Sequence, residues 1–430
     1  MTIIAHYNLE ARQYDIITAF LNTLMKEFAI FVEQPYGFAQ FDGEQPLVCL
    51  LLKSLYGLKQ SPMLWQQQLT LFLNSKGFKP LLSDPCIYQH RITKAILAVY
   101  VDDLILAALT TTTITEIEGV LTAQFKMKCL GELSFYLGCY ITRDRTEKAI
   151  YLTQEAYINQ LLNSYNADSL KALETPLLPG TQLIKAENDY EPSNNILNEY
   201  QSLIGRLMWP SIQTRADITF AVAQLSRHLV KPTTDHLNTA KRILRYLKGT
   251  RCYGITIKSK DKELKLVGYT DSSYADNRDN STSTGGYTFH LNDSLISWKS
   301  VKQRTVALSS TEAKWNAAVT TCQEAAYLSA LCSEFSLIEL SMTPVTIKAD
   351  NMSQIALTKR SGVDGRTKHM NNRLHWLREQ VNNHKVTFQW VPTEQQAANG
   401  LTKALTAPKH HQFCHLIGIT DLTKEVTKKE

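Results

Sequence analysis

The stretch Ala95-Ile96-Leu97-Ala98-Val99-Tyr100-Val101-Asp102-Asp103-Leu104-Ile105-Leu106-Ala107-Ala108 decides the fold of the first part of this chain. Two apolar runs flank Asp102 and Asp103, which predicts a β-hairpin with two carboxylates at its tip. Adjacent carboxylates at the end of buried strands repel each other and resist desolvation unless a cation neutralises them. Oxygen ligands suit Mg²⁺, and two such ions can stabilise both the attacking and the leaving oxygen of a phosphoryl transfer. A solvated acidic turn is the alternative that this spacing leaves open.

The composition places the chain among folded, mildly basic proteins. It has 430 residues, a formal net charge of +6, 44% hydrophobic and 20% charged residues, and a length that suggests about three domains. No apolar run reaches the roughly 18 to 20 residues of a membrane span, and the first residues lack a signal-peptide pattern. The eight cysteines include no C-x-x-C pair, so neither a zinc site nor a disulfide scaffold is expected. We therefore expect an intracellular protein and exclude a disordered, transmembrane or secreted one.

The pattern along the rest of the chain predicts an α/β organisation. A polar connector is expected at 178–198 and helices at 200–249. Three strands are expected at 263–300, with turns at Gly285-Gly286 and Asn292-Asp293. Further helices are predicted at 19–28, 310–335 and 374–381, and strands at 29–33, 345–349 and 385–391. This order of elements indicates α/β layers and not a repeat array.

Several motifs recur in a fixed order along the chain. They are Asp15 to Asn22, Glu33 to Phe38, Ser54 to Pro62, Tyr100 to Asp103, Leu203 to Gly205, Thr214 to Ile218 and Arg242 to Thr250. Together they closely resemble the reverse transcriptase of copia-type LTR retrotransposons. The resemblance implies an α/β (α+β) fold: a polymerase palm at 1–165, a thumb or connection segment at 166–260, a ribonuclease H-like domain at 261–420 and a tail at 421–430.

The resemblance also assigns residues of the palm. Asp15, Asp102 and Asp103 match its three metal-binding acids, although Asp15 alone would be taken for a surface residue. Phe20 falls where the family places an aromatic residue that excludes the ribose 2′-hydroxyl; the alternative is ordinary core. A nearby segment matches the family's contacts to the template and the incoming nucleotide, through Tyr56, Gly57, Lys59 and Gln60. The alternative explanation of this segment is a plain turn at the start of a helix.

A second set of acids lies in the last third of the chain. Asp271, Glu312 and Asp350 resemble the metal-binding acids of the ribonuclease H domain that follows the polymerase in this family. Purely structural explanations of these acids are also open. Ser309 and Glu312 are spaced as a helix capping box, and the two aspartates follow strands, where turn acids are common. Asn399 stands where the family has a fourth acid, and its amide brings no charge.

Two features bear on nucleic-acid binding. Lys241, Arg245 and Lys248 recur on one side of a predicted helix, either as a solvated face or, as we prefer beside a palm, as contacts to phosphates. The chain begins shortly before Asp15, so we expect the upstream fingers residues that hold the triphosphate to be absent.

The resemblance implies a Mg²⁺-dependent RNA-directed DNA polymerase with an associated ribonuclease H, with Mn²⁺ as an alternative metal. The expected partners are an RNA template, a DNA primer, RNA–DNA hybrids and dNTPs, without a membrane. The expected location is a cytoplasmic particle, with the nucleus as an alternative. Two other hypotheses stay open: a catalytically silent nucleic-acid-binding remnant, and a chain in which only the nuclease acts.

Overall fold

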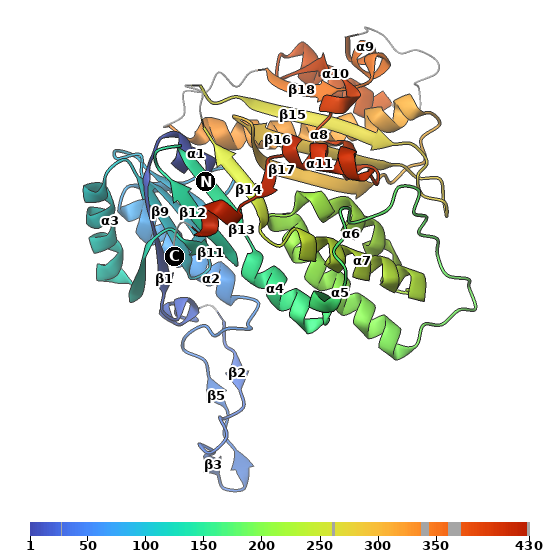
Figure 1. Cartoon of the computed structure of the whole chain (residues 1–430). Helices are drawn as coiled ribbons and strands as arrows, with labels where there is room; N and C mark the ends of the chain where they lie inside the picture. The colour runs from blue at the N-terminus through green and yellow to red at the C-terminus, as the bar shows by residue number, and fades with distance from the viewer. Residues whose placement is uncertain (27, 260–262, 337–343, 360–370, 428–430) are drawn as a thin grey trace. The chain divides into compact units, whose positions relative to one another are not determined.

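The computed structural model describes residues 1–26, 28–259, 263–336, 344–359 and 371–427 (Figure 1). The chain forms two compact units. The smaller unit is built around Tyr7–Leu133, and the larger unit joins Met1–His6 with most of the chain from Ser134 onward. Both units mix helices and sheets, which confirms the predicted α/β class. Within the described residues, every helix is too short or too polar to cross a membrane.

The smaller unit contains an antiparallel six-stranded sheet in the order β10-β1-β9-β8-β7-β6. Its strands are β1 (Glu10–Ile16), β6 (Phe78–Pro80), β7 (Ile87–His90), β8 (Ile96–Tyr100), β9 (Asp103–Ala108) and β10 (Met127–Glu132). Helices α2 (Ser61–Ser75) and α3 (Thr111–Gln124) bury their apolar residues in one core with this sheet. The pairing of β8 with β9, with Tyr100 opposite Asp103, confirms the predicted hairpin.

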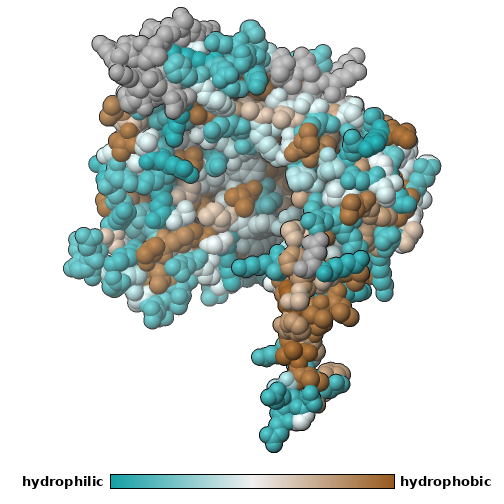
Figure 2. Space-filling view, turned by 180° about the vertical axis from the view of Figure 1, so that it is seen from behind, coloured by the Kyte–Doolittle hydropathy of each residue, from teal (hydrophilic) through white to brown (hydrophobic). Residues whose placement is uncertain are grey.

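A narrow arm leaves the smaller unit between β1 and α2 (Figure 1). It contains the short strands β2 (Phe31–Val32), β3 (Phe41–Asp42), β4 (Gln45–Pro46) and β5 (Cys49–Leu50). Figure 2 shows apolar side chains along its shaft. In this arm Phe31, Phe38 and Leu52 are all more than 60% exposed. The helix predicted at 19–28 is wrong: only the 3-10 turn η1 (Ala19–Asn22) forms, because Thr18 takes a left-handed φ of 54° and Leu24 pairs with Lys53.

The larger unit begins with a sheet whose strands come from distant parts of the chain. Helix α1 (Thr2–His6) precedes it, and its strand order is β11-β12-β13-β14-β20. The strands are β11 (Phe135–Tyr136), β12 (Cys139–Asp144), β13 (Ala149–Thr153), β14 (Tyr253–Lys258) and β20 (Ile419–Asp421). Strand β13 pairs with β14, and β14 with β20, so this sheet joins segments from three of the domains expected from the sequence, whose boundaries at 165/166, 260/261 and 420/421 stay predictions.

A helical layer follows, with one core that includes α4 (Glu155–Ser164), α5 (Asn194–Gln213), α6 (Thr219–Leu225) and α7 (Thr234–Gly249). The short helices η2 (Ala167–Ser169), η3 (Ala216–Ile218) and η4 (Ser226–His228) join them. Residues 170–193 form neither helix nor strand, which matches most of the expected connector.

The last sheet has the order β17-β16-β15-β18-β19, antiparallel among β15, β16 and β17 and parallel among β15, β18 and β19. Its strands are β15 (Leu266–Ser273), β16 (Thr284–Leu291), β17 (Ser294–Lys302), β18 (Val345–Ala349) and β19 (Val386–Trp390). Its helices are α8 (Ser310–Glu334), α9 (Met352–Lys359), α10 (Asn371–Asn382), η6 (Thr393–Gln395), η7 (Asn399–Leu401), α11 (Ala407–Leu416) and, after β20, α12 (Thr423–Thr427). The strands and helices predicted between 310 and 391 are confirmed.

The turn predicted at Gly285-Gly286 is wrong, because both glycines lie inside β16. A Cβ at Gly286 would lie 2.8 Å from the Cβ of Leu401, and one at Gly285 would lie 3.3 Å from that of Ala317. These glycines allow η7 and α8 to approach the strand closely.

Candidate active sites

Three acids meet at one end of the sheet in the smaller unit; we call them the hairpin site: Asp15, Asp102 and Asp103. Asp15 on β1 lies directly opposite Asp103 on β9, so their side chains point to the same face of the sheet. Asp102 is in the two-residue turn that joins β8 to β9. All three are half-buried. The strand register thus brings together residues that are almost ninety positions apart in the sequence.

The backbone of this turn is held from two sides. Val101 has a φ of 57°, which is rare for a β-branched residue and requires support from its surroundings. The indole Nε1 of buried Trp65 donates a hydrogen bond to the Val101 carbonyl at 2.8 Å. The amide of Ile16 donates to the Asp102 carbonyl at 2.8 Å. Trp65 was missed by the sequence analysis; its only signal was a tryptophan shortly after the Ser54 to Pro62 motif.

The hairpin site carries uncompensated negative charge. Burial raises the pKa of Asp103 above its ordinary value, and the charges of Asp102 and Asp15 raise it further. None of the three acids forms an ion pair within the described part of the chain, and the nearest polar group is the Tyr56 hydroxyl, 3.4 Å from Asp102 Oδ2. Carboxylate oxygens suit a divalent cation, which would relieve the repulsion, although the ligand atoms of these three acids do not all lie within 4.8 Å of one another.

The predicted nucleotide-contact residues lie beside these acids. The rings of Phe20 and Tyr56 pack with centroids 4.6 Å apart. Gly57 has a φ of 91°, which favours glycine. The exposed side chain of Lys59 has no ion pair among the described residues, and Gln60 is the N-cap residue of α2. Of these residues, Tyr56 contacts Asp102 through its hydroxyl, and Phe20 packs on Tyr56.

A second group lies at the end of the last sheet; we call it the sheet-end site and define it as Asp271, Lys314 and Asp350. Strands β15 and β18 are parallel with Tyr269 opposite Lys348, so Asp271 and Asp350 lie at the same level. Asp350 follows β18 as predicted, but Asp271 lies inside β15, which continues to Ser273. Lys314 on α8 reaches between them: its Nζ donates to Asp350 Oδ1 and lies 3.3 Å from Asp271 Oδ1. No motif in the sequence analysis included Lys314.

Further groups neutralise Asp271. The Nζ atom of Lys403 lies 3.6 Å from Asp271 Oδ2, and the Thr402 hydroxyl donates to the same oxygen at 2.6 Å. Burial by itself lowers the pKa of Lys314, but the charges of Asp271 and Asp350 and their hydrogen bonds raise it above its ordinary value. The lysine therefore stays protonated in this site.

The other two predicted ribonuclease H residues have different partners. The Glu312 carboxylate accepts the amide hydrogen of Leu308 at 2.7 Å, and Ser309 Oγ accepts that of Glu312 at 3.1 Å. The pair therefore caps the start of α8, with the glutamate bonded to Leu308 and not to Ser309 as in a regular capping box. Asn399 donates from Nδ2 to the Thr393 carbonyl at 2.9 Å, and its Oδ1 is buried without a hydrogen bond. Glu312, Asp271 and Asp350 do not form a set with ligand atoms within 4.8 Å of one another.

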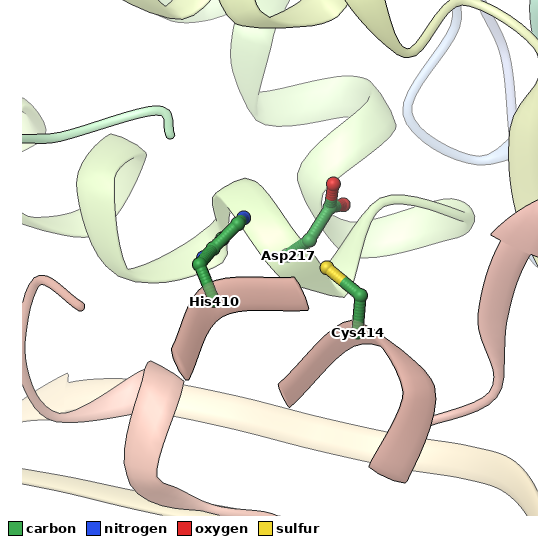
Figure 3. Close-up of side chains that lie close together, drawn as sticks. All are labelled: Asp217, His410 and Cys414. Atoms are coloured by element: carbon green, nitrogen blue, oxygen red, sulfur yellow. The ribbon is translucent and has the colours of Figure 1, made fainter. Parts of the chain in front are cut away.

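Among the described residues, only Asp217, His410 and Cys414 form such a compact set, with His410 and Cys414 on α11 and Asp217 on η3 (Figure 3). Asp217 is already saturated, because fully buried Arg215 donates to both of its oxygens, at 3.0 and 2.7 Å, and Tyr246 donates at 2.6 Å. This carboxylate therefore needs no metal ion to balance its charge. The cluster is a buried polar network and explains the Thr214 to Ile218 motif.

The basic residues of α7 are engaged within the unit. Lys241 pairs with Glu199 at 2.6 Å, Arg245 Nε donates to the Lys171 carbonyl, and Lys248 Nζ donates to the carbonyls of Asp168 and Leu170. All three basic side chains therefore have partners within the unit, and these partners compete with the phosphate contacts that we prefer.

Comparison with protein families gives one match over the first part of the chain. A family model described as reverse transcriptase (RNA-dependent DNA polymerase) matches residues 1–179. Among solved structures, LC11-RNase H1 in complex with an RNA/DNA hybrid has 12% sequence identity and a TM-score of 0.25, covering 32% of this chain and 93% of that one.

Curated relatives cover more of the chain. The retrovirus-related Pol polyprotein from transposon TNT 1-94 of Nicotiana tabacum is 36% identical over 425 residues, 97% of this chain and 32% of the relative. The Pol polyprotein from transposon RE1 of Arabidopsis thaliana is 34% identical over 95% of this chain and 27% of its own length. A putative transposon Ty5-1 protein of Saccharomyces cerevisiae is 33% identical over 72% of this chain and 99% of its own length. The chain thus spans about a third of the length of the first two relatives.

Proposed function

This chain belongs to the reverse transcriptase family of copia-type retrotransposon Pol polyproteins, a polymerase and ribonuclease H class of enzyme, and we propose that its hairpin site extends a primer on a nucleic-acid template. The observation that carries the proposal is that Asp15 and Asp103 share one face at the end of the sheet where Asp102 begins the turn, and that none of the three acids forms an ion pair within the described chain. The proposed substrates are an RNA template, a DNA primer and dNTPs.

The three carboxylates would hold Mg²⁺, with Mn²⁺ as the alternative. When bound, the metal would stabilise the charge that develops on the attacking and leaving oxygens of phosphoryl transfer. Trp65 and Ile16 fix the turn that carries Asp102, so the carboxylate is positioned before substrate arrives.

The neighbouring residues suit a nucleotide. The exposed ring of Tyr56, which packs on the buried ring of Phe20, offers an apolar surface beside Asp102 on which a sugar could rest. Lys59 offers an exposed ammonium to a phosphate, and the positive φ of Gly57 sets the loop that presents it. We assign these residues to substrate contact and not to the chemical step.

Primer extension by the purified chain tests the proposal. We expect Mg²⁺-dependent incorporation that falls at least about 100-fold in Asp102→Asn, because loss of even an outer-shell partner of a metal costs 10- to 100-fold. Asp42→Asn, the same substitution at an exposed acid in the arm, is the matched control and should retain the parent rate. If the parent incorporates nothing with either metal, the silent-remnant hypothesis replaces this one.

A further inference from the structure

The ribonuclease H resemblance implies a divalent metal on the acids of the last sheet, but the residues there do not fit one. Asp271 and Asp350 are almost fully buried, with side chains 1% and 9% exposed. The position between their Oδ1 atoms is already taken by the ammonium of Lys314, whose side chain is only 17% exposed. A metal would have to displace that ammonium or bind against its charge.

We propose that Lys314 is the built-in counter-ion of the sheet-end site, so that this site neither binds a divalent metal nor cleaves RNA in a hybrid. The charges support this. Two carboxylates face the ammonium groups of Lys314 and Lys403, which lie 3.3 and 3.6 Å from the two oxygens of Asp271. The group of four side chains has no net charge, whereas a metal site made of carboxylates has an excess of negative charge.

The position of Lys314 is fixed by its helix. Its neighbour Trp315 is fully buried, and Gln354 of α9 donates from Nε2 to the Lys314 carbonyl at 2.9 Å. The ammonium therefore comes from a packed part of α8. Asp271 Oδ1 makes no hydrogen bond, so its compensation depends on the ion pair with Lys314.

The other two predicted ribonuclease H residues have partners of their own. Glu312 accepts the Leu308 amide hydrogen, and Asn399 donates from Nδ2 to the Thr393 carbonyl, while its Oδ1 makes no hydrogen bond and brings no charge. Thr402 donates its hydroxyl hydrogen to Asp271 Oδ2. If the proposed polymerase function also holds, the RNA strand of the hybrid that the chain makes must be removed by a separate nuclease.

Binding of Mn²⁺, measured by electron paramagnetic resonance of the free ion, tests the inference on the full chain. The parent for this test carries Asp102→Asn and Asp103→Asn, so that the hairpin site does not contribute. We expect no site in the parent below about 1 mM Mn²⁺, and one site at least about 100-fold tighter in Lys314→Glu, where a carboxylate replaces the ammonium. Lys265→Glu makes the same charge change at an exposed residue just before β15 and should bind like the parent.

A second variant keeps the test decisive if Lys314→Glu fails to fold. In Lys314→Met the two aspartates lose their ammonium, so millimolar Mn²⁺ should raise its melting temperature by several degrees more than that of the parent. The inference is overturned if the parent binds Mn²⁺ below 1 mM and Asp350→Asn abolishes that binding. It is also overturned if neither Lys314 variant responds to Mn²⁺ more than Lys265→Glu does.

Hybrid cleavage gives an independent readout on the chain with an intact hairpin site. We expect no Mg²⁺-dependent cleavage of the RNA strand; cleavage that Asp350→Asn abolishes would overturn the inference. Failure of primer extension would leave these results unaffected, because neither measurement uses the polymerase reaction.

Discussion

Replacing Arg215 with lysine should locally destabilise the larger unit, because lysine keeps the charge but loses the planar fork. The Arg215 guanidinium donates four hydrogen bonds, two to Asp217 and two to Thr250, at 2.7 to 3.0 Å. Its side chain and that of Asp217 are both fully buried. A lysine amine can reach one oxygen of Asp217 and one of Thr250, so about two of the four bonds are lost.

The magnitude follows from the kind of bond that is lost. Hydrogen bonds to charged groups contribute about 1.5–3 kcal/mol each, and partial relaxation reduces the sum, so we expect a loss of about 2–4 kcal/mol. This corresponds to roughly 30- to 1,000-fold faster opening of the surrounding structure. Native-state hydrogen exchange of peptides from α7, which carries Tyr246 and ends beside Thr250, should show this increase.

Arg251→Lys is the matched control. Arg251 pairs with Asp168 at 3.1 Å, but the two side chains are 38% and 44% exposed, so the substitution should cost less than about 0.5 kcal/mol. If Arg215→Lys and Arg251→Lys exchange within threefold of each other in α7, the buried network does not stabilise this region as we argue.

Two further predictions concern single groups. Trp65→Phe keeps an aromatic ring in the core but removes the donor to the Val101 carbonyl; primer extension should slow about fivefold in kcat, the equivalent of one hydrogen bond of about 1 kcal/mol, with little change in KM for the nucleotide. An unchanged kcat would show that the turn needs no such anchor. Burial lowers the pKa of His410 to about 4, below the ordinary value of 6.5 in the unfolded chain, so acidification from pH 6.5 to 4 protonates the unfolded state first and removes up to about 3 kcal/mol of stability. Urea unfolding of His410→Gln across this range should depend less on pH than that of the parent, and an equal slope would contradict the assignment.

The hairpin was predictable because its signal is local. Two apolar strands and a turn with two acids adjoin in the sequence, and the observed strands β8 and β9 differ from the predicted runs by one residue. The strands and helices from 310 to 391 were also predictable from local sequence; α8, for example, runs from Ser310 to Glu334 without a glycine or a proline. The pairing of β13 with β14 and of β14 with β20 joins segments about 100 to 160 residues apart, which no local pattern indicates.

The helix predicted at 19–28 failed because tertiary pairing overrides weak propensity. Its sequence is apolar enough for a helix, but Leu24 pairs with Lys53 at the base of the arm. The turn predicted at Gly285-Gly286 failed for another reason: glycine in a strand can mark close approach of a neighbouring element as well as a turn. Only the contact with Leu401 and Ala317 distinguishes the two cases.

Lys314 could have been found from helix geometry. Residues two apart on a helix point in directions about 200° apart, so Glu312 and Lys314 cannot both face the aspartates. The capping box already gave Glu312 a reason to face the N-terminal end of its helix, which leaves the other direction to Lys314. A pattern made of acidic residues alone does not include Lys314, because the residue that contacts Asp271 and Asp350 has the opposite charge.

The two acid sites therefore differ in what they still require. The hairpin site presents three carboxylates that form no ion pair within the described chain, whereas the sheet-end site presents two carboxylates already matched by two ammonium groups. Charges of one sign held close together destabilise a protein unless an opposite charge neutralises them. The first arrangement therefore favours binding of a cation, and the second opposes it. Because the sites lie in different compact units, an inactive sheet-end site does not entail an inactive hairpin site. The charge of the third residue, and not the resemblance of the surrounding motif, decides which of the two can use a metal.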